Sequence, residues 1–208
     1  MAHAAEVDTA RSILTAARAR LLVDGYAGLS TRKIAQEAGV PLSQVHYHFG
    51  SKRGMVLALL ETENRRRLAR QTSMYAQDAP LSRRYEQACD FLEDDLESGF
   101  VRVLQEMIAA GWSAPDIAEA ARTLLSGWYE LLTDVAKEAA AKLGGLGPFS
   151  PEEVATLIGN VFMGSEAMLL LGFDRQRLPI RASLRRIGEV IRLAEQRVAQ
   201  NKPREVPA

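Results

Sequence analysis

The sequence predicts an all-α fold of about nine helices, with a three-helix unit at the N-terminus and a larger helical region after it. Of the 208 residues, 47% are hydrophobic and only 6% are aromatic, and 15 glycines and 8 prolines leave long segments unbroken. Within these segments apolar residues recur every three or four positions, which is the spacing of one helix face. Glycine, proline and capping residues divide the segments from one another.

The first predicted helix begins at Asp8 or Thr9, either of which can cap a helix, and ends near Gly25. Its apolar stripe is made of Ile13, Leu14, Ala17, Leu21 and Leu22.

Two short helices joined by a tight turn are predicted over Ser30–Lys52, which reads STRKIAQEAGVPLSQVHYHFGSK. Ser30 is a suitable N-cap, Gly39 can adopt the left-handed conformation that ends a helix, and Pro41 suits the first turn of the next one. The inward faces are predicted to be Ile34, Ala35 and Ala38 on one helix and Val45 and Phe49 on the other. The outward positions of the second helix are mostly uncharged hydrogen-bonding groups, which is typical of a helix-turn-helix that offers side chains to a DNA groove.

The stretch GLSTRKIAQEAGVPLSQVHYHFGSK closely resembles the DNA-binding segment of TetR-family transcriptional regulators. The shared features are a Thr or Ser, then IA, AGV, a Tyr-x-His-Phe-like tetrad and a closing Lys. The resemblance covers the N-terminal quarter of the chain. It implies a homodimer that binds an inverted-repeat operator in double-stranded DNA, and a repressor that a small, largely apolar effector releases.

The DNA contacts predicted for this segment are of two kinds. The resemblance assigns phosphate contacts to Thr31, Tyr47, His48 and Lys52. Arg32 has the geometry to pair with guanine and Gln44 with adenine. The remaining candidates are Lys33, Leu42, Ser43 and His46.

Three of these positions leave alternatives open. Leu42 either covers a thymine methyl group or packs against Val45, and we weigh the two equally. His46 stands where the family usually has a phosphate-binding tyrosine, and Ser43 where glycine is frequent, so the mode of contact at His46 is open. A metal site formed by His46 and His48 is excluded. The two residues are two positions apart on a helix, so their side chains point about 200° apart and cannot bind the same ion.

The remaining helices are predicted from the capping, glycine and proline residues that separate them. Ser51 caps a fourth helix over about residues 52–75 that connects a DNA-binding domain, residues 1–54, to a ligand-binding and dimerisation domain, residues 55–208. Further helices are expected after Pro80, after Gly99, from Pro115, from Pro151 to about Gly172 and from Ile180 to about Gln200, with a frayed tail over residues 201–208.

The basic run Arg65–Arg67 with Arg70 has two interpretations. It is either a second DNA contact or, as we favour, a solvated face or an internal partner for the acids of residues 93–97.

The last two helices are predicted to form a four-helix bundle with a second copy of the chain. The helix from Pro151 is apolar on nearly all sides, so we expect it to be buried on more than one side; its glutamates argue against a membrane span. The expected dimer contacts are Val154, Ile158, Val161, Leu184, Ile187, Ile191 and Val198.

An effector pocket among the middle helices is implied by the resemblance. Its candidate lining is Phe91, Met107, Trp112, Trp128, Tyr129, Phe162 and Met163, with Glu106, Asn160 or Glu166 as polar anchors. The alternative is ordinary core packing, which is the commoner role of such side chains.

Charge and cysteine content limit the function classes. Residues 1–60 hold seven Lys or Arg and four Asp or Glu, so this part carries +3 in a chain of net charge zero, and favours a phosphate-rich partner. The single cysteine, Cys89, excludes an internal disulfide, and without an apolar N-terminal signal we expect a cytoplasmic location.

An enzyme is disfavoured, and neither a cofactor nor a metal is expected, because no nucleophile–base pair or glycine-rich phosphate loop occurs. The alternative function is a DNA-binding regulator that has no small effector and is controlled by a protein partner or by abundance.

Overall fold

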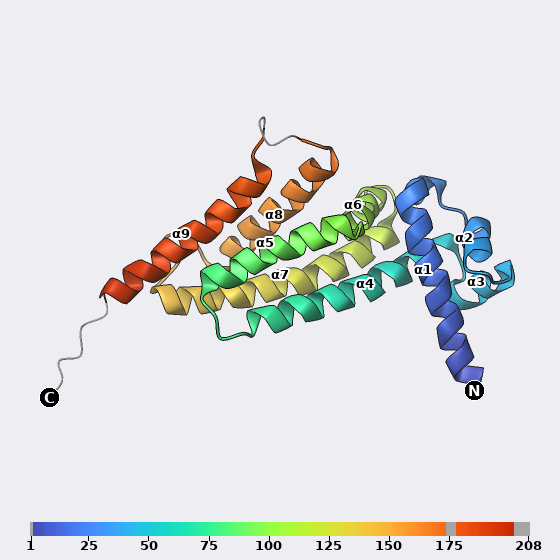
Figure 1. Ribbon diagram of the computed structural model, residues 1–208, viewed down its shortest axis with the longest axis horizontal. Coiled ribbons are helices and arrows are strands. Elements are labelled where there is room, and N and C mark those ends of the chain that lie inside the picture. Colours follow the sequence, from blue (N-terminus) through green and yellow to red (C-terminus); the bar gives the residue numbers. More distant parts are fainter. Residues whose placement is uncertain (1, 174–177, 202–208) are drawn as a thin grey trace. The chain divides into compact units, whose positions relative to one another are not determined.

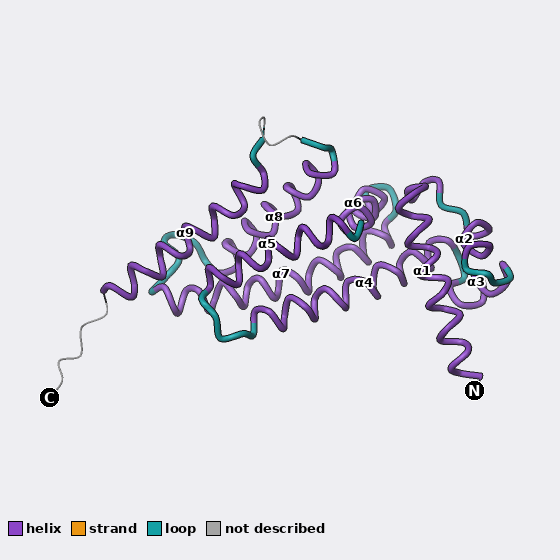
Figure 2. Tube along the Cα trace, viewed as in Figure 1, coloured by secondary structure: helices purple, strands orange, loops and turns teal. Residues whose placement is uncertain are grey.

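The computed structural model describes residues 2–173 and 178–201, which fold into nine helices and no strand (Figures 1 and 2). The helices are α1 (Ala2–Gly28), α2 (Thr31–Glu37), α3 (Leu42–Phe49), α4 (Lys52–Tyr75), α5 (Leu81–Glu97), α6 (Phe100–Gly111), α7 (Pro115–Leu143), α8 (Pro151–Leu170) and α9 (Ile180–Asn201). The all-α fold is therefore confirmed. Apart from Asn201, which ends α9, the tail expected over residues 201–208 lies outside the described residues.

The chain forms two compact units that alternate along the sequence. The first contains the described residues up to Arg67 together with Ser98–Leu125, and the second contains Leu68–Glu97 and the described residues from Ser126 onward. In the first unit α1 packs on α2, α3 and α6, and in the second α9 packs on α5 and α8. The division into domains 1–54 and 55–208 stays a prediction.

Helix α1 starts earlier than the sequence predicted. It begins at Ala2, so a start at Asp8 or Thr9 is wrong, because the alanine-rich segment before them continues the helix. At the other end Gly25 leaves the helical conformation with φ 67°, where the sequence placed the helix end. The carboxylate of Glu106 accepts a hydrogen bond from the Tyr26 backbone N–H at this kink.

The turn between α2 and α3 follows from its glycine. Gly39 has φ 68°, and the amides of Gly39 and Val40 donate to the carbonyls of Gln36 (3.2 Å) and Ala35 (3.0 Å). This pair of bonds satisfies the last carbonyls of α2 and turns the chain sharply. Ser30 occupies the N-cap position of α2, although its side chain makes no capping bond there.

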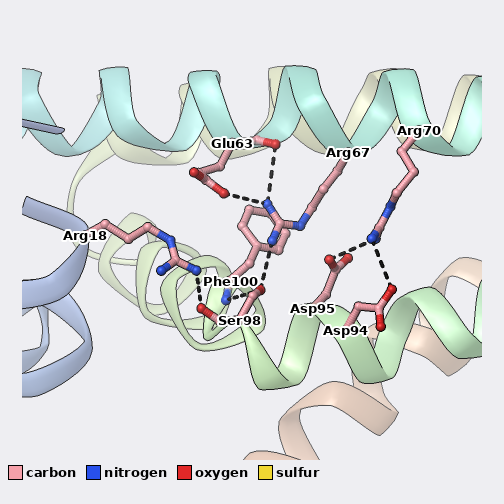
Figure 3. Close-up of polar contacts among 8 residues, drawn as sticks. All are labelled: Arg18, Glu63, Arg67, Arg70, Asp94, Asp95, Ser98 and Phe100. Atoms are coloured by element: carbon pink, nitrogen blue, oxygen red, sulfur yellow. Dashed lines mark hydrogen bonds and ion pairs between the residues drawn. The ribbon is translucent and has the colours of Figure 1, made fainter. Parts of the chain in front are cut away.

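Within the first unit, α4 is joined to the start of α6 by Arg67 (Figure 3). The guanidinium lies 3.5 Å from the ring centroid of Phe100, donates to Ser98 Oγ at 3.1 Å and pairs with Glu63 at 2.8 Å. Arg18 of α1 donates to the carbonyl of Ser98. Three helices of this unit thus share one polar junction.

In the second unit Arg70 pairs with Asp95 at 2.9 Å and with Asp94 at 3.5 Å (Figure 3). The Arg70 guanidinium also lies 4.0 Å from the ring centroid of Phe91. This confirms the favoured interpretation of Arg70 as an internal partner for the acids of residues 93–97.

The second unit also contains a nearly buried ion pair. Arg84, which is 2% exposed, donates from Nη2 to Glu138 Oε1 at 2.6 Å and from Nη1 to Glu138 Oε2 at 3.0 Å and to the Tyr75 carbonyl. The Arg84 hydrogen bond lowers the pKa of Glu138 to about 2, with Lys142 assisting at 2.8 Å. Close by, burial raises the pKa of the Cys89 thiol to about 11.

Helix α8 is less covered than its composition predicted. Ser150 and Glu153 form a capping box at its start, but within one chain only Ala155, Gly159 and Phe162 are buried. By length and composition alone, Pro151–Leu170 is also the one described helix apolar enough to cross a membrane.

Candidate nucleic-acid interface

Helix α3 is fixed in the first unit by a short apolar face. Val45 is fully buried and contributes to the same core as Ile34 and Ala35 of α2. The helix ends at Gly50, which has φ 69° and whose amide donates to the His46 carbonyl at 2.9 Å. Because one face is held in this way, the opposite face of α3 is turned to solvent.

The predicted DNA contacts lie together on α2, α3 and the first residue of α4. Arg32, Lys33, Ser43, His46 and Tyr47 are exposed. The half-buried ones are Thr31, Leu42, Gln44, His48 and Lys52. Their roles toward DNA stay predictions.

The acidic neighbours of α2 engage some of its cations. Lys33 lies 3.6 Å from Asp24, which also pairs with Arg20, and Arg20 lies 3.7 Å from Glu37. The hydrogen bond from Arg20 lowers the pKa of Asp24. Arg32 makes no ion pair with any described residue, so its guanidinium is available for a partner outside the chain.

Two histidines of α3 are placed differently. His46 Nδ1 lies 3.2 Å from the Gly50 carbonyl oxygen, which can only accept, so Nδ1 carries the proton in this contact. The ring of His48 contacts those of Tyr47 and Phe49, with centroid distances of 5.1 and 6.0 Å, and its Nε2 is buried without a hydrogen-bond partner among the described residues. A phosphate contact from Nε2 of His48 would therefore require this atom to become exposed.

Tyr47 and Lys52 already have partners inside the first unit. The Tyr47 hydroxyl donates to Glu6 Oε1 at 2.9 Å, and this hydrogen bond raises the pKa of Tyr47. Lys52 Nζ donates to the carbonyls of Tyr26 at 2.8 Å and Ala27 at 3.4 Å, near the end of α1. Sequence reasoning did not anticipate Glu6, because it comes before the predicted start of α1.

The predicted effector residues of the second unit include a connected aromatic cluster. The ring centroids of Trp128 and Tyr129 are 5.4 Å apart, and those of Trp128 and Phe162 are 6.5 Å apart. Tyr129 donates to Asn160 Oδ1 at 2.8 Å, and burial with the charge of Glu166 raises the pKa of Tyr129. Phe91 and Met163 are half-buried.

Two further residues of this cluster, Tyr85 and Gly159, were not among the predicted effector residues. The Tyr85 ring lies 6.0 Å from Phe162, and Gly159 lets α8 approach Tyr129 so closely that a Cβ there would collide with its ring.

The predicted effector residues of the first unit are arranged otherwise. Met107 is fully buried, Trp112 is 84% exposed, and Glu106 is engaged at the kink of α1 and with Arg102 at 3.2 Å. A ligand role for Met107, Trp112 or Glu106 stays a prediction, and their positions give it no support.

The predicted dimer contacts are mostly half-buried in the single chain. Leu184 is only 2% exposed, so a partner has little of it left to cover. Other apolar side chains on the same two helices are more exposed: Leu157 is 50%, Val190 62% and Leu193 53% exposed. On α9, at about 100° per residue, Val190 lies about 90° and Leu193 about 150° from the middle of the predicted stripe.

A groove of about 360 Å³ lies between α8 and α9 in the second unit. Its lining includes Val161, Gly164 and Met168 of α8 and Ile180, Leu184 and Ile187 of α9.

Comparison with known proteins gives a family model and a fold. Residues 13–59 match the model of bacterial regulatory proteins of the tetR family. No curated protein sequence matches.

Three solved structures are similar over most of the chain. A putative TetR-family transcriptional regulator from Rhodococcus sp. has a TM-score of 0.73 at 18% identity, with 89% of this chain and 98% of that chain covered. A putative regulator from Saccharomonospora viridis in complex with choline has a TM-score of 0.70 at 22% identity, with 86% and 93% covered. FadR from Bacillus subtilis in complex with stearoyl-CoA has a TM-score of 0.67 at 14% identity, with 87% and 96% covered.

Proposed function

We propose that this chain, as a member of the TetR family of bacterial regulatory proteins, is a dimeric, ligand-responsive repressor of transcription in the cytoplasm. Its role as a transcriptional regulator follows from the family. The repressor activity, the dimer, the effector and the location are our inferences.

The exposed face of α3 is the observation that supports DNA binding most directly. Val45 holds the helix from inside, while Ser43, His46 and Tyr47 face solvent with hydrogen-bonding groups. Arg32 of α2 adds an exposed guanidinium that can pair with the O6 and N7 atoms of guanine. We assign base contacts to Arg32 and Gln44 and phosphate contacts to Thr31 and Tyr47.

A second copy of the chain would place a second α3 on the same DNA. Half-sites about 34–36 Å apart would then be read together. The exposed apolar residues Leu157, Val190 and Leu193 support association through α8 and α9, because a partner would remove them from water. Closed symmetry makes such an interface self-complementary and the operator an inverted repeat.

The effector is proposed to bind in the second unit, next to the aromatic cluster of Trp128, Tyr129 and Phe162. The cluster combines apolar rings with the polar groups of Asn160 and Glu166, as small-molecule sites commonly do. Structures of similar fold hold choline and stearoyl-CoA, which supports a ligand-responsive function for this fold. An effector shifts DNA occupancy only by its different affinities for the DNA-binding and released states.

Selection of bound duplexes from a random DNA pool tests the proposal. We expect an inverted repeat, and a relaxed preference at one position per half-site for Arg32→Ala and for Gln44→Ala. Arg122→Ala is the matched control, because it removes an exposed arginine of the same unit from α7 instead of α2. If the two test variants select the same sequences as the wild type, the assignment of base contacts is wrong. A thermal-shift screen of small molecules distinguishes the ligand-responsive regulator from one without an effector.

A further inference from the structure

The N-terminal part of α1 brings an acidic side chain to the candidate DNA-binding face. Because α1 begins at Ala2, Glu6 lies within the helix, and its Oε1 accepts the hydroxyl proton of Tyr47 at 2.9 Å. The two residues are 41 positions apart in the sequence and both are exposed. The contact is therefore a surface hydrogen bond that solvent and other partners can reach.

The chemistry of the phenol makes this contact incompatible with a phosphate contact. A tyrosine hydroxyl has one proton to donate, and both a carboxylate and a DNA phosphate only accept. The hydroxyl of Tyr47 can therefore serve Glu6 or a phosphate at one time, and not both.

We propose that Glu6 competes with a DNA phosphate for the Tyr47 hydroxyl and so lowers the affinity of the regulator for its operator. The inference rests on the proposed function, in which Tyr47 is a phosphate contact. Glu6 then acts as an autoinhibitory residue: each protomer must open its Glu6–Tyr47 bond before its α3 can engage the backbone. Because one hydrogen bond is exchanged for another, Glu6 lowers the operator affinity by about 3- to 10-fold per half-site. When both half-sites are engaged, the affinity is lowered by about 10- to 100-fold.

Two substitutions separate the hydrogen bond from the charge. Glu6→Ala removes both, whereas Glu6→Asp keeps the charge and withdraws the carboxylate by one methylene. The operator affinity of each variant is measured by fluorescence anisotropy at fixed salt, since phosphate contacts are salt-dependent. We expect both variants to bind more tightly than the wild type.

Two controls complete the design. Asp8→Ala removes the same charge from the same exposed part of α1, and we expect wild-type affinity. In a Tyr47→Phe background, which should bind more weakly than the wild type, Glu6→Ala is expected to give no gain, because no hydroxyl remains for which to compete.

Each outcome supports or overturns the competition. If Glu6→Asp binds DNA as the wild type does and only Glu6→Ala binds more tightly, the charge of Glu6 alone lowers the operator affinity, and the proposal is overturned. An equal gain from Asp8→Ala, or a gain from Glu6→Ala that persists with Tyr47→Phe, overturns the proposal as well. Failure of the wild type to bind any selected duplex refutes the proposed function instead, and is recognised before any variant is compared.

A measurement without DNA tests the contact itself. The ionisation of Tyr47 can be followed by carbon NMR of ring-labelled tyrosine, with Tyr47→Phe giving the assignment. We expect Glu6→Ala to lower the pKa of Tyr47 toward the ordinary tyrosine value, since the bond to Glu6 raises it in the wild type. An unchanged Tyr47 ionisation would show that the hydroxyl does not bind Glu6 in solution, and would overturn the proposal.

Discussion

Replacing Glu138 by glutamine is expected to destabilise the protein strongly at neutral pH. The substitution keeps the shape of the side chain and removes its charge, so Arg84, with a side chain only 3% exposed, loses its anionic partner. A buried guanidinium without a counter-charge is costly, and the Tyr75 carbonyl alone does not replace a bidentate carboxylate.

The magnitude follows from the pKa of Glu138, which is about 2 in the folded chain against an ordinary value of 4.5. At 1.36 kcal/mol per pKa unit this difference corresponds to roughly 3.4 kcal/mol. The Glu138 side chain is 34% exposed, and solvent screening reduces the expected loss to about 2 kcal/mol. For a chain of this length, that loss lowers Tm by about 4–8 °C.

The pH dependence has a definite sign. Because folding lowers the pKa of Glu138, its stabilising effect is fully present above about pH 4.5 and is lost as the pH falls toward 2. Urea unfolding at fixed protein concentration should therefore show the full difference between Glu138→Gln and the wild type at pH 7, and a smaller one at pH 3.5.

Glu130→Gln is the matched control, since Glu130 is exposed on the same helix and makes no ion pair with a described residue. We expect this control within about 0.5 kcal/mol of the wild type. The reasoning is refuted if Glu138→Gln is equally mild at pH 7, or if its loss of stability is the same at pH 3.5.

Three further predictions concern the glycines, the dimer and the junction of the first unit. Gly99→Ala should lower the unfolding free energy more than Gly39→Ala in chemical denaturation. Both glycines have positive φ (79° and 68°), but only at Gly99 would a Cβ meet a side-chain atom at 2.5 Å. Equal losses of stability would contradict this prediction. Leu193→Glu should yield monomers in sedimentation analysis, whereas Val23→Glu, in the first unit and more exposed (71% against 53%), should not; a dimeric Leu193→Glu places the interface elsewhere. Arg67→Lys should lower the unfolding free energy by about 1 kcal/mol, since an ammonium cannot stack flat on its aromatic partner, and an unchanged value would reject that contact.

The parts of the fold that short-range chemistry determines could be predicted from the sequence. The turn between α2 and α3 needs only Gly39 and Pro41, and the start of α4 only Ser51, whose Oγ accepts from the Gly54 amide at 3.0 Å. The start of α1 could not be found in this way. Asp8 and Thr9 are good caps, but a cap signal does not stop a helix whose preceding residues are themselves strong helix formers.

The site was less predictable where a side chain has a partner far along the chain. Glu106 is suitable as an anchor for a ligand, yet it binds the backbone of Tyr26, 80 residues away. The same reason hides the partner of Tyr47, because no local pattern connects α3 to Glu6. Residues of one helix face, such as Val45, were predictable, since periodicity alone decides which side is inward.

The burial of Cys89 makes the chain suitable for site-specific labelling. With a pKa of about 11, only about one thiol in ten thousand is ionised at pH 7, and thiolate is the form that alkylating and oxidising reagents attack. A maleimide dye should therefore react with a new surface cysteine and leave the only native one untouched. Spectroscopic probes can thus be placed on α3 or α9 while Cys89 keeps its native side chain.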